Sequence, residues 1–573
     1  MIIRHAPEVL IPNNAPAPVK YAAGELKRCF SVIFSEEGPA GGGVRVVLDP
    51  QGAALPAPDG FRLEIGPDEI RVLAGTPRAV VYGAYGLLEK MGCRFLAGDC
   101  EVLPRGPAAL EEGAWDDLPA FYARELFWRD AMDGAFAVKL RLNSARSTIT
   151  EEMGGRLAFY NFSHSFSALV PPDRWFESHP EYFSMVDGVR RKERTQLCLT
   201  NPDVLRLCVD GVKKWARENP KCRIFSVSMN DWYSPCTCPE CARVDAEEGS
   251  RAGTVIRFVN RVAEETEKEF PGIMIHTFAY LYCRRPPLIT RPRHNVIVRL
   301  CSIECCFAHP IAECGCESGG IDVQYGSARA FRGEKKNENA FLKDLIGWSK
   351  ICENLYIWDY TTNYANYLLP FPNLNALQAN LRLFKGHHVT GVFEQGNFSL
   401  GACSALGALK TYLLAKWLWD PDLDGEALTR DFAAGYYGAA AETMLKYISL
   451  WKNACGENDH AGIYDTSDAP YLTDERLEEA DALLKKALHE AGDVMYRERV
   501  ERERLSVRYA HLTRLPLDAP RRDDLIDAFA RDAEALGITE LFERKSLSSS
   551  VTVMKKSRFA LDRSAAEAIS YPI

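Results

Sequence analysis

The middle of the chain alternates short apolar segments with amphipathic helical patterns, and each apolar segment ends in polar or aromatic residues. Eight such segments recur, at residues 122–128, 138–146, 156–166, 223–231, 274–283, 296–306, 355–364 and 389–397. Apolar strands that recur with helices between them are typical of a parallel sheet or barrel. Eight strands are the number that a TIM (β/α)8 barrel requires, so we expect an α/β fold of that type.

The flanking regions have different patterns. Residues 1–115 combine two amphipathic helical stretches with short strands of alternating apolar and polar residues, which predicts a small α/β supporting domain. Residues 402–573 are helical in pattern, with breaks at Asp420–Pro421 and at 435–438. We therefore expect three domains: an N-terminal α/β domain (1–115), a catalytic barrel (116–401) and a C-terminal helical domain (402–573).

Composition narrows the classes of partner. The 573 residues are 47% apolar and 26% charged, and the formal net charge is -9. No long basic run occurs, which argues against nucleic acid and anionic membranes as partners. No apolar run is long enough for a membrane span or a signal peptide, so we expect a cytoplasmic protein, or an extracellular one if a leader was removed. The oligomeric state is left open.

Three carboxylates directly follow apolar segments: Asp231, Glu304 and Glu394. In a parallel barrel such positions lie at the carboxyl ends of strands, where catalytic side chains lie. Glycoside hydrolysis needs a carboxylic acid to protonate the leaving oxygen, and burial raises the pKa of such a group. We predict these three as catalytic residues. The alternative for Glu304 and Glu394 is an ion pair, for example with Arg299 or Arg284. The alternative for Asp231 is that it caps the following loop together with Asn230.

Other polar and aromatic residues at the same segment ends are predicted to bind substrate, because aromatic faces stack on sugar rings and polar groups bind hydroxyls. They are His164, Asn230, Trp232, Tyr280, Asp359, Tyr360, Asn363, Gln395 and Asn397. The amide of Asn230 could orient an acetamido group, or it could cap a turn. Alternation along 355–360 leaves the register open: either Ile357 and Asp359 face the barrel interior, or Trp358 and Tyr360 do.

Eighteen cysteines raise the question of metal. Cys236, Cys238 and Cys241 have zinc-ligand spacing, and Cys314 and Cys316 could complete a tetrahedral site. Such a zinc would be structural, since four sulfurs leave no open position. The alternative is a set of reduced, packed thiols. We expect no cofactor for catalysis.

Six blocks of sequence, taken together, resemble a known family. They lie at residues 174–204, 228–265, 299–310, 355–373, 391–397 and 415–438. In these blocks the chain resembles glycoside hydrolase family 163, long described as a bacterial domain of unknown function. The resemblance implies an N-terminal α/β domain like that of β-hexosaminidases, a TIM barrel and a helical tail. It also implies an endo-acting β-N-acetylglucosaminidase that cleaves N-glycan-type oligosaccharides with retention of anomeric configuration.

Two alternatives stay open beside this leading hypothesis. An exo-glycosidase of another specificity, for example on uronic acids, predicts arginines that line a closed pocket, because a carboxylate substrate needs guanidinium partners. A non-catalytic carbohydrate-binding protein on the same fold predicts no pair of carboxylates at glycosidase spacing. All three hypotheses share a carbohydrate as the partner.

Overall fold

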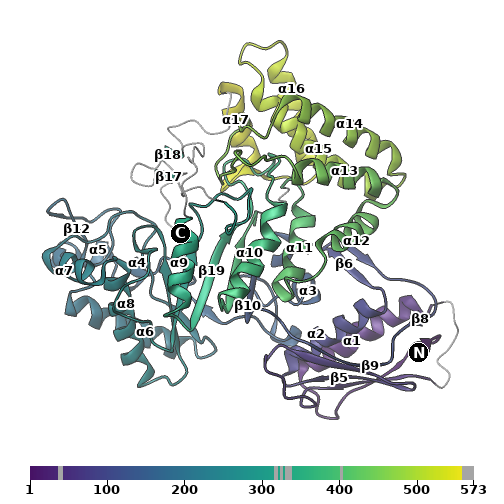
Figure 1. Ribbon diagram of the computed structural model, residues 1–573, viewed down its shortest axis with the longest axis horizontal. Coiled ribbons are helices and arrows are strands. Elements are labelled where there is room, and N and C mark those ends of the chain that lie inside the picture. Colours follow the sequence, from purple (N-terminus) through teal and green to yellow (C-terminus); the bar gives the residue numbers. More distant parts are fainter. Residues whose placement is uncertain (36–42, 315–320, 323–326, 329–338, 400–403, 558–573) are drawn as a thin grey trace. The chain divides into compact units, whose positions relative to one another are not determined.

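The computed structural model of the chain describes residues 1–35, 43–314, 321–322, 327–328, 339–399 and 404–557. The chain, coloured from its N-terminus to its C-terminus in Figure 1, divides into two compact units. Of the described residues, unit 1 takes those within 1–157, 361–382 and 394–557, and unit 2 takes those within 158–360 and 383–393. Each unit is described by itself.

Unit 1 begins with an open sheet and two helices. The sheet order is β2-β3-β5-β4-β9, with strands β2 (Glu8–Leu10), β3 (Arg45–Asp49), β4 (Phe61–Ile65), β5 (Glu69–Ala74) and β9 (Gly113–Asp117). Helices α1 (Ala17–Ile33) and α2 (Pro77–Lys90) pack on each other, and α2 packs on β4 and β5. At Gly83 a Cβ would lie 2.4 Å from Cγ1 of Val72, so glycine permits this close approach. The predicted N-terminal helices and strands are confirmed.

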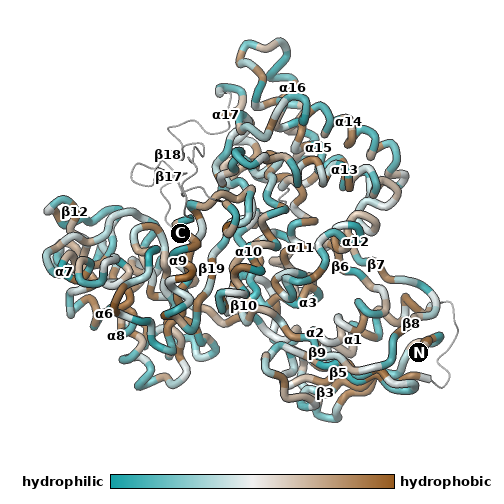
Figure 2. The backbone as a smooth tube through the Cα atoms, viewed as in Figure 1, coloured by the Kyte–Doolittle hydropathy of each residue, from teal (hydrophilic) through white to brown (hydrophobic). Residues whose placement is uncertain are grey.

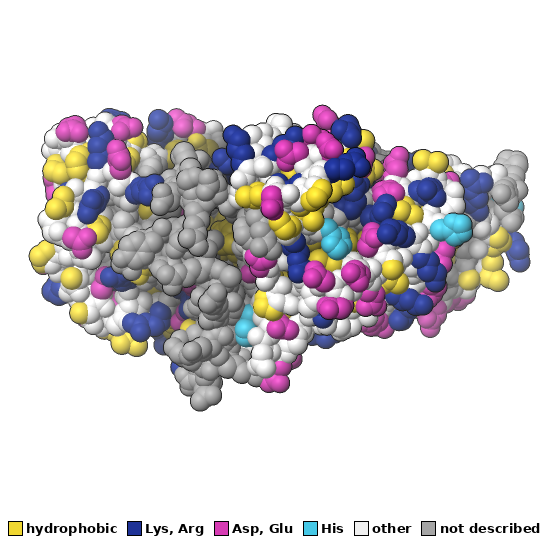
Figure 3. Space-filling model, turned by 90° about the horizontal axis from the view of Figure 1, so that it is seen from above, with side chains coloured by type: hydrophobic (Ala, Val, Ile, Leu, Met, Phe, Trp, Pro, Cys, Tyr) yellow, Lys and Arg dark blue, Asp and Glu magenta, His cyan; other side chains and the backbone are white. Residues whose placement is uncertain are grey.

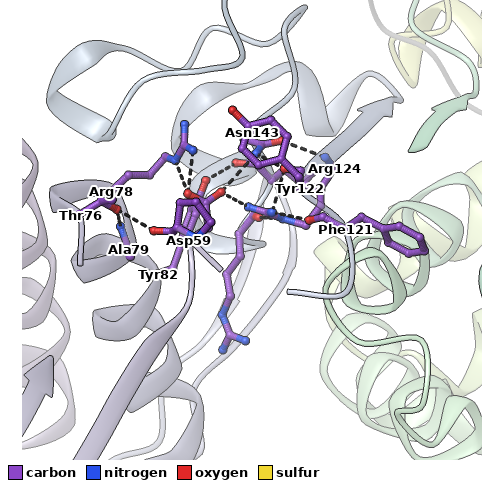
Figure 4. A network of polar contacts seen from close by, with 12 residues as sticks. Asp59, Thr76, Arg78, Ala79, Tyr82, Phe121, Tyr122, Arg124 and Asn143 are labelled. Atoms are coloured by element: carbon purple, nitrogen blue, oxygen red, sulfur yellow. Dashed lines mark hydrogen bonds and ion pairs between the residues drawn. The ribbon is translucent and has the colours of Figure 1, made fainter. Parts of the chain in front are cut away.

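Unit 1 contains a network of buried charged side chains (Figure 4). Arg124 on β10 (Ala123–Phe127) is fully buried, and its Nη2 lies 2.7 Å from Oδ2 of Asp59. Nη2 of Arg78 lies 2.7 Å from Oδ1 of the same carboxylate. Burial works against the charged form of Asp59, but these two guanidinium groups hold its pKa below the ordinary value. The buried charges are therefore paired, as the desolvation cost requires.

The rest of unit 1 is mainly helical. Its helices from residue 407 onwards are α11 (Gly407–Trp419), α12 (Gly425–Tyr437), α13 (Ala441–Lys452), α14 (Asp474–Glu490), α15 (Val494–Arg514), α16 (Arg522–Ala535) and α17 (Leu547–Lys556). Teal and brown alternate along α14, as expected for a helix with one solvated face (Figure 2). The predicted breaks at Asp420–Pro421 and at 435–438 are confirmed. The boundaries at 115/116 and 401/402 stay predictions.

Unit 2 is built on a parallel sheet. The strand order of this half-barrel is β10-β20-β19-β16-β15-β14-β11. The strands after β10 are β11 (Phe159–Tyr160), β14 (Ile224–Ser226), β15 (Met274–Ala279), β16 (Val296–Cys301), β19 (Asn354–Tyr360) and β20 (Gly391–Gln395). Helices between them include α6 (Pro202–Glu218), α7 (Pro239–Glu248), α8 (Ala252–Glu267), α9 (Ala340–Ser349) and α10 (Leu374–Gly386). Helix α8 packs on β15 and β16.

One of the eight predicted strands is wrong. Residues 138–146 contain the end of helix α3 (Gly134–Lys139), followed by a turn in which Arg141 has a φ of 59°. The segment then runs beside β10 but bonds to it partly through side chains: Oδ1 of Asn143 accepts from the Arg124 amide at 2.9 Å, and Oγ of Ser144 accepts from the Leu126 amide at 2.9 Å. The alternating apolar residues imitate a strand, but the sheet is a half-barrel of seven strands.

Aromatic side chains fill the inner face of the unit 2 sheet. The guanidinium carbon of Arg299, which is fully buried, lies 4.5 Å from the ring centre of Phe162 and 5.8 Å from that of Trp358. The Trp358 ring also meets Phe278 and Phe393, at centroid distances of 5.6 and 4.4 Å. Trp358 therefore faces inward, and alternation turns Asp359 to the opposite face. This settles the register that the sequence leaves open.

The surface carries both signs of charge. On the face in Figure 3, basic and acidic side chains are interspersed among the described residues. No described helix combines the length and apolar character that crossing a membrane requires.

Candidate functional site

Asp231 lies just beyond β14, at the carboxyl end of the parallel sheet. Its side chain is half-buried, and its Oδ1 accepts a hydrogen bond of 3.3 Å from the Tyr280 hydroxyl at the end of β15. The structure therefore brings together two predicted site residues from neighbouring strands.

A network of hydrogen bonds fixes the backbone on both sides of Asp231. Nε2 of Gln196 donates to the carbonyl oxygens of Asn230 and Trp232, at 2.7 Å each, and Oε1 of Gln196 accepts from the Asn230 amide at 2.8 Å. One buried glutamine thus holds the residues before and after Asp231. These hydrogen bonds restrict the backbone of the loop that carries Asp231.

The Asn230 side chain is part of the same hydrogen-bond network. Its Oδ1 accepts from the Ser167 amide at 3.1 Å, and its Nδ2 donates to the Thr195 carbonyl at 2.9 Å. Asn230 is 6% exposed. In this conformation it anchors the loop, and the predicted contact with an acetamido group would require both bonds to break.

His164 lies on a segment that runs along the end of β14. Its Nδ1 is 2.8 Å from the Met229 carbonyl oxygen, and a carbonyl can only accept, so Nδ1 carries a proton. Its ring centre is 6.4 Å from that of Tyr280. The backbone has a φ of 51°, a conformation uncommon outside glycine and asparagine. His164, Asp231 and Tyr280 thus form one group at the end of the sheet.

Trp232 stands next to Asp231 and is half-buried. The guanidinium carbon of Arg194 lies 5.3 Å from the centre of its ring. Tyr233, which follows, is 45% exposed and meets Tyr282 edge to face at 5.9 Å. These aromatic side chains provide faces on which a sugar ring could stack.

Glu304 has a different environment. It forms an ion pair with Nη1 of Arg284, whose Nε lies 2.7 Å from Oδ2 of Asp344 on α9. Burial raises the pKa of Glu304, and the Arg284 guanidinium opposes that shift. The ion-pair alternative for Glu304 therefore holds in this structure.

Three of the predicted site carboxylates, Asp231, Glu304 and Asp359, influence the cysteines next to the end of β16. The pKa of the Cys301 thiol is raised well above its ordinary value by burial, with further contributions from Glu304 and Asp231. Burial likewise raises the pKa of Cys305, and Asp359 and Glu304 add to the shift. Asp359 is 2% exposed and accepts a hydrogen bond from the Ser302 hydroxyl. Its side chain is therefore engaged below the surface.

Tyr360 belongs to the inner aromatic face. Its ring centre lies 6.4 Å from that of Trp358 and 6.3 Å from that of Phe307. It is 7% exposed, so little of its ring is accessible to a sugar.

The remaining predicted residues lie in unit 1. Glu394, at the end of β20, is 1% exposed. The Gln395 carbonyl accepts from the Tyr364 hydroxyl at 2.7 Å. Oδ1 of Asn397 accepts from the Ser399 amide at 3.1 Å, and Nδ2 of Asn363 donates to the Asp465 carbonyl at 2.8 Å. Gln395 and the two asparagines thus brace loops within unit 1.

The cysteines predicted to bind metal separate in the structure. Cys236, Cys238 and Cys241 form one buried cluster. Cys314 lies instead near His309 and Cys306, whose thiols raise the pKa of the imidazole to about 10. Cys316 lies outside the described residues.

Comparison with known proteins identifies the family. Residues 95–449, more than half of the chain, match the family described as "Domain of unknown function (DUF4838)". The chain belongs to the DUF4838 family. No curated protein matches it.

The DUF4838 chain also has the fold of two solved glycoside hydrolases. One is described as a novel family GH115 4-O-methyl-alpha-glucuronidase with specificity for decorated arabinogalactans, with a TM-score of 0.55, 11% identity and coverage of 95% of this chain and 81% of that one. The other is described as a GH138 enzyme targeting pectin rhamnogalacturonan II, with a TM-score of 0.51, 9% identity and coverage of 96% and 98%. The chain thus has a glycoside-hydrolase-like fold, and neither the family match nor these two structures bears out the resemblance to family 163.

The DUF4838 region contains every predicted site residue. Sequence reasoning does not identify Gln196 as a site residue, although it holds the loop around Asp231. A signal is nevertheless present, because Gln196 lies in one of the six blocks that carry the family resemblance. A polar residue in such a block, outside the strand ends, is a candidate for supporting the site.

Proposed function

We propose that this DUF4838 protein is a glycoside hydrolase and that Asp231 is its proton donor. The observation that carries the proposal is the setting of Asp231: a half-buried carboxyl group at the end of a parallel strand, bonded to the Tyr280 hydroxyl and fixed on both sides by Gln196. The fold shared with two glycoside hydrolases supports the reaction class.

In this proposal Asp231 gives its proton to the glycosidic oxygen as the bond to the anomeric carbon breaks. Negative charge then develops on the carboxylate, and the Tyr280 hydroxyl, 3.3 Å from Oδ1, donates a hydrogen bond to it. The half-buried Trp232 stacks on a sugar ring next to the bond that breaks.

The leading substrate is a β-linked N-acetylglucosaminide of the N-glycan type, cleaved with retention. Its support is the resemblance of the six sequence blocks to family 163. Because both atoms of the Asn230 amide bind backbone, this residue is not the partner that would hold the acetamido group.

The second candidate is an exo-acting hydrolase of uronic acids. It is favoured by the fold shared with a glucuronidase and by Arg194, whose guanidinium lies over Trp232. A guanidinium can bind a sugar carboxylate through two hydrogen bonds.

The test uses aryl β-N-acetylglucosaminides, aryl α-glucuronides and N-glycan oligosaccharides with the wild type and the Asp231→Asn variant. We expect one class to be cleaved and the variant to lose roughly 10³-fold in kcat. The matched control is Asp173→Asn on the surface, where the side chain is 98% exposed, and it should keep full activity. Full activity of Asp231→Asn would refute the assignment.

Arg194→Met separates the two substrates. If the substrate is a uronic acid, this variant should raise KM by at least about tenfold, because a charge-assisted pair is lost. An unchanged KM would favour the N-acetylglucosaminide.

A further inference from the structure

Four buried cysteines meet beside the loop that carries Asp231. Their thiols belong to Cys198, Cys236, Cys238 and Cys241, and the four sulfur atoms all lie within 4.8 Å of one another. Each side chain is at most 8% exposed. Cys198 comes from the segment before α6, and the other three come from the loop after β14 and the first turn of α7.

The spacing of the sulfur atoms fits one metal ion. Sγ of Cys198 lies 3.6 Å from Sγ of Cys238 and 3.9 Å from Sγ of Cys241. In a tetrahedral site with zinc–sulfur bonds of about 2.3 Å, neighbouring sulfurs are about 3.8 Å apart. A disulfide would need sulfurs about 2.0 Å apart, so these distances exclude one in this arrangement.

The surroundings of the sulfurs suit thiolates. Sγ of Cys236 accepts from the Met185 amide at 3.4 Å and from Nη1 of Arg190 at 3.6 Å. Oγ1 of Thr200 lies 3.2 Å from Sγ of Cys241. Donors directed at sulfur ligands are the usual second layer around a metal, because they offset the charge of four thiolates.

We propose that Cys198, Cys236, Cys238 and Cys241 bind one structural zinc ion. Three of the ligands form a Cys-x-Cys-x-x-Cys group, and the fourth arrives from a segment 38 positions before the first of them. All four coordination positions are filled by sulfur, so the ion has no open site for substrate or water. Its role is to join two segments of chain.

The joined segments are the ones that hold Asp231. Gln196, two residues before Cys198, donates to the carbonyls of Asn230 and Trp232. Zinc therefore fixes the Gln196 segment and the Asp231 loop to each other. Loss of the metal should free this loop while the rest of the sheet stays folded.

The test measures zinc by elemental mass spectrometry in protein purified without added metal. We expect at least one equivalent in the wild type. Because His309, Cys306 and Cys314 also offer metal ligands, the decisive quantity is a difference: Cys198→Ser and Cys238→Ser should each hold about one equivalent less than the wild type. The matched control, Cys208→Ser, changes a buried thiol on α6 outside the cluster and should keep the wild-type content.

A second measurement covers variants that fail to fold. The wild type, stripped of metal under reducing conditions, should take up Co²⁺ with the absorption of a tetrahedral thiolate complex and show slower amide exchange at residues 194–200 and 230–241 once loaded. Three results would overturn the proposal: less than about a tenth of an equivalent of zinc with no uptake of Co²⁺, unchanged zinc content in a folded Cys198→Ser variant, or a disulfide among the four cysteines.

Discussion

The ends of β14 and β16 carry the same sequence pattern and different chemistry. Asp231 and Glu304 both follow a buried strand, and the sequence predicts both to be catalytic. Asp231 meets a neutral tyrosine hydroxyl, whereas Glu304 meets the guanidinium of Arg284. The guanidinium of Arg284 occupies the Glu304 carboxylate in an ion pair, although burial still raises the pKa of Glu304. The position of a carboxylate at the end of a strand identifies it as a candidate catalytic residue. The residue that it contacts from another segment of the chain distinguishes one candidate from the other.

The Glu304 region is built as a brace. Arg284 pairs with Glu304 and with Asp344, and its carbonyl accepts a hydrogen bond of 2.7 Å from Nε1 of Trp348. These contacts join the chain after β15 to α9 and to the turn after β16. The Asp231 region is built as a support for one side chain, with its polar bonds directed at the backbone.

The largest expected effect is on activity. Asp231→Asn should lower kcat by roughly 10³-fold, whereas Glu304→Gln should keep more than about a tenth of the wild-type value. Both variants are assayed on the glycoside that the wild type cleaves. The comparison breaks if Glu304→Gln loses as much activity as Asp231→Asn while unfolding at the same temperature as the wild type.

The next effect is on stability. Arg284→Met leaves two carboxylates near each other without a cation, and we expect the free energy of unfolding to fall by about 3 to 5 kcal/mol. Glu304→Gln keeps the pair between Arg284 and Asp344, and its cost should be about 1 to 2 kcal/mol. Urea unfolding of both variants measures the difference. Equal stability of Arg284→Met and the wild type would show that the ion pairs of Arg284 do not stabilise the fold.

A third carboxylate extends the comparison to pH. Glu248 accepts from the amides of Ile289 and Thr290, at 3.0 Å each, and from Nε of Arg257 at 2.7 Å. Burial opposes its charged form, but hydrogen bonds from the Thr290 hydroxyl, from the two amides and from Arg257 lower its pKa to about 2. A lowered pKa stabilises the fold above the unfolded value of about 4.5, and this contribution is lost as the pH falls towards 2.

The measurement is the stability of the wild type and Glu248→Gln between pH 6 and the acid limit of folding. We expect Glu248→Gln to cost roughly 2 to 3 kcal/mol near neutral pH, with the difference shrinking as the pH falls below about 4.5. A difference that stays constant with pH would show that the charge of Glu248 contributes nothing.

The smallest expected effect is on activity, from removing the Tyr280 hydroxyl that donates a hydrogen bond to Asp231. Tyr280→Phe removes one hydrogen bond to the carboxylate that forms during the reaction, so kcat/KM should fall by about tenfold without loss of stability. Tyr233→Phe, an exposed neighbour, is the control and should change little. A fall of equal size in both variants would mean that the Tyr280 hydroxyl has no specific role.

Much of the fold follows from the sequence because its signals are local. Alternation and helical periodicity predict six of the strands in the order of unit 2 and β10 beside them. The segment 138–146 fails because Val138, Leu140 and Leu142 imitate a strand, while Asp133 caps a helix that includes Val138. Local alternation cannot reveal that competing cap.

The site follows less completely because it depends on partners distant in sequence. The spacing of Cys236, Cys238 and Cys241 is recognisable in the sequence as a metal-binding motif. Cys198 is distant in sequence and lies beside them only in the folded chain. From the sequence, the side-chain amide of Asn230 could bind a substrate, but in the structure both of its polar atoms form hydrogen bonds with the backbone. The choice between Asp231 and Glu304 requires Tyr280 and Arg284, about 50 and 20 positions away along the chain.

The most direct test of Asp231 as proton donor compares leaving groups. Aryl glycosides of the sugar that the wild type cleaves are assayed with Asp231→Ala, one series with acidic phenols and one with weakly acidic phenols. An acidic phenol departs without a proton, so kcat/KM should fall less than about tenfold for it and roughly 10³-fold for the poor leaving groups. An equal loss across both series would show that Asp231 donates no proton in the step that breaks the glycosidic bond.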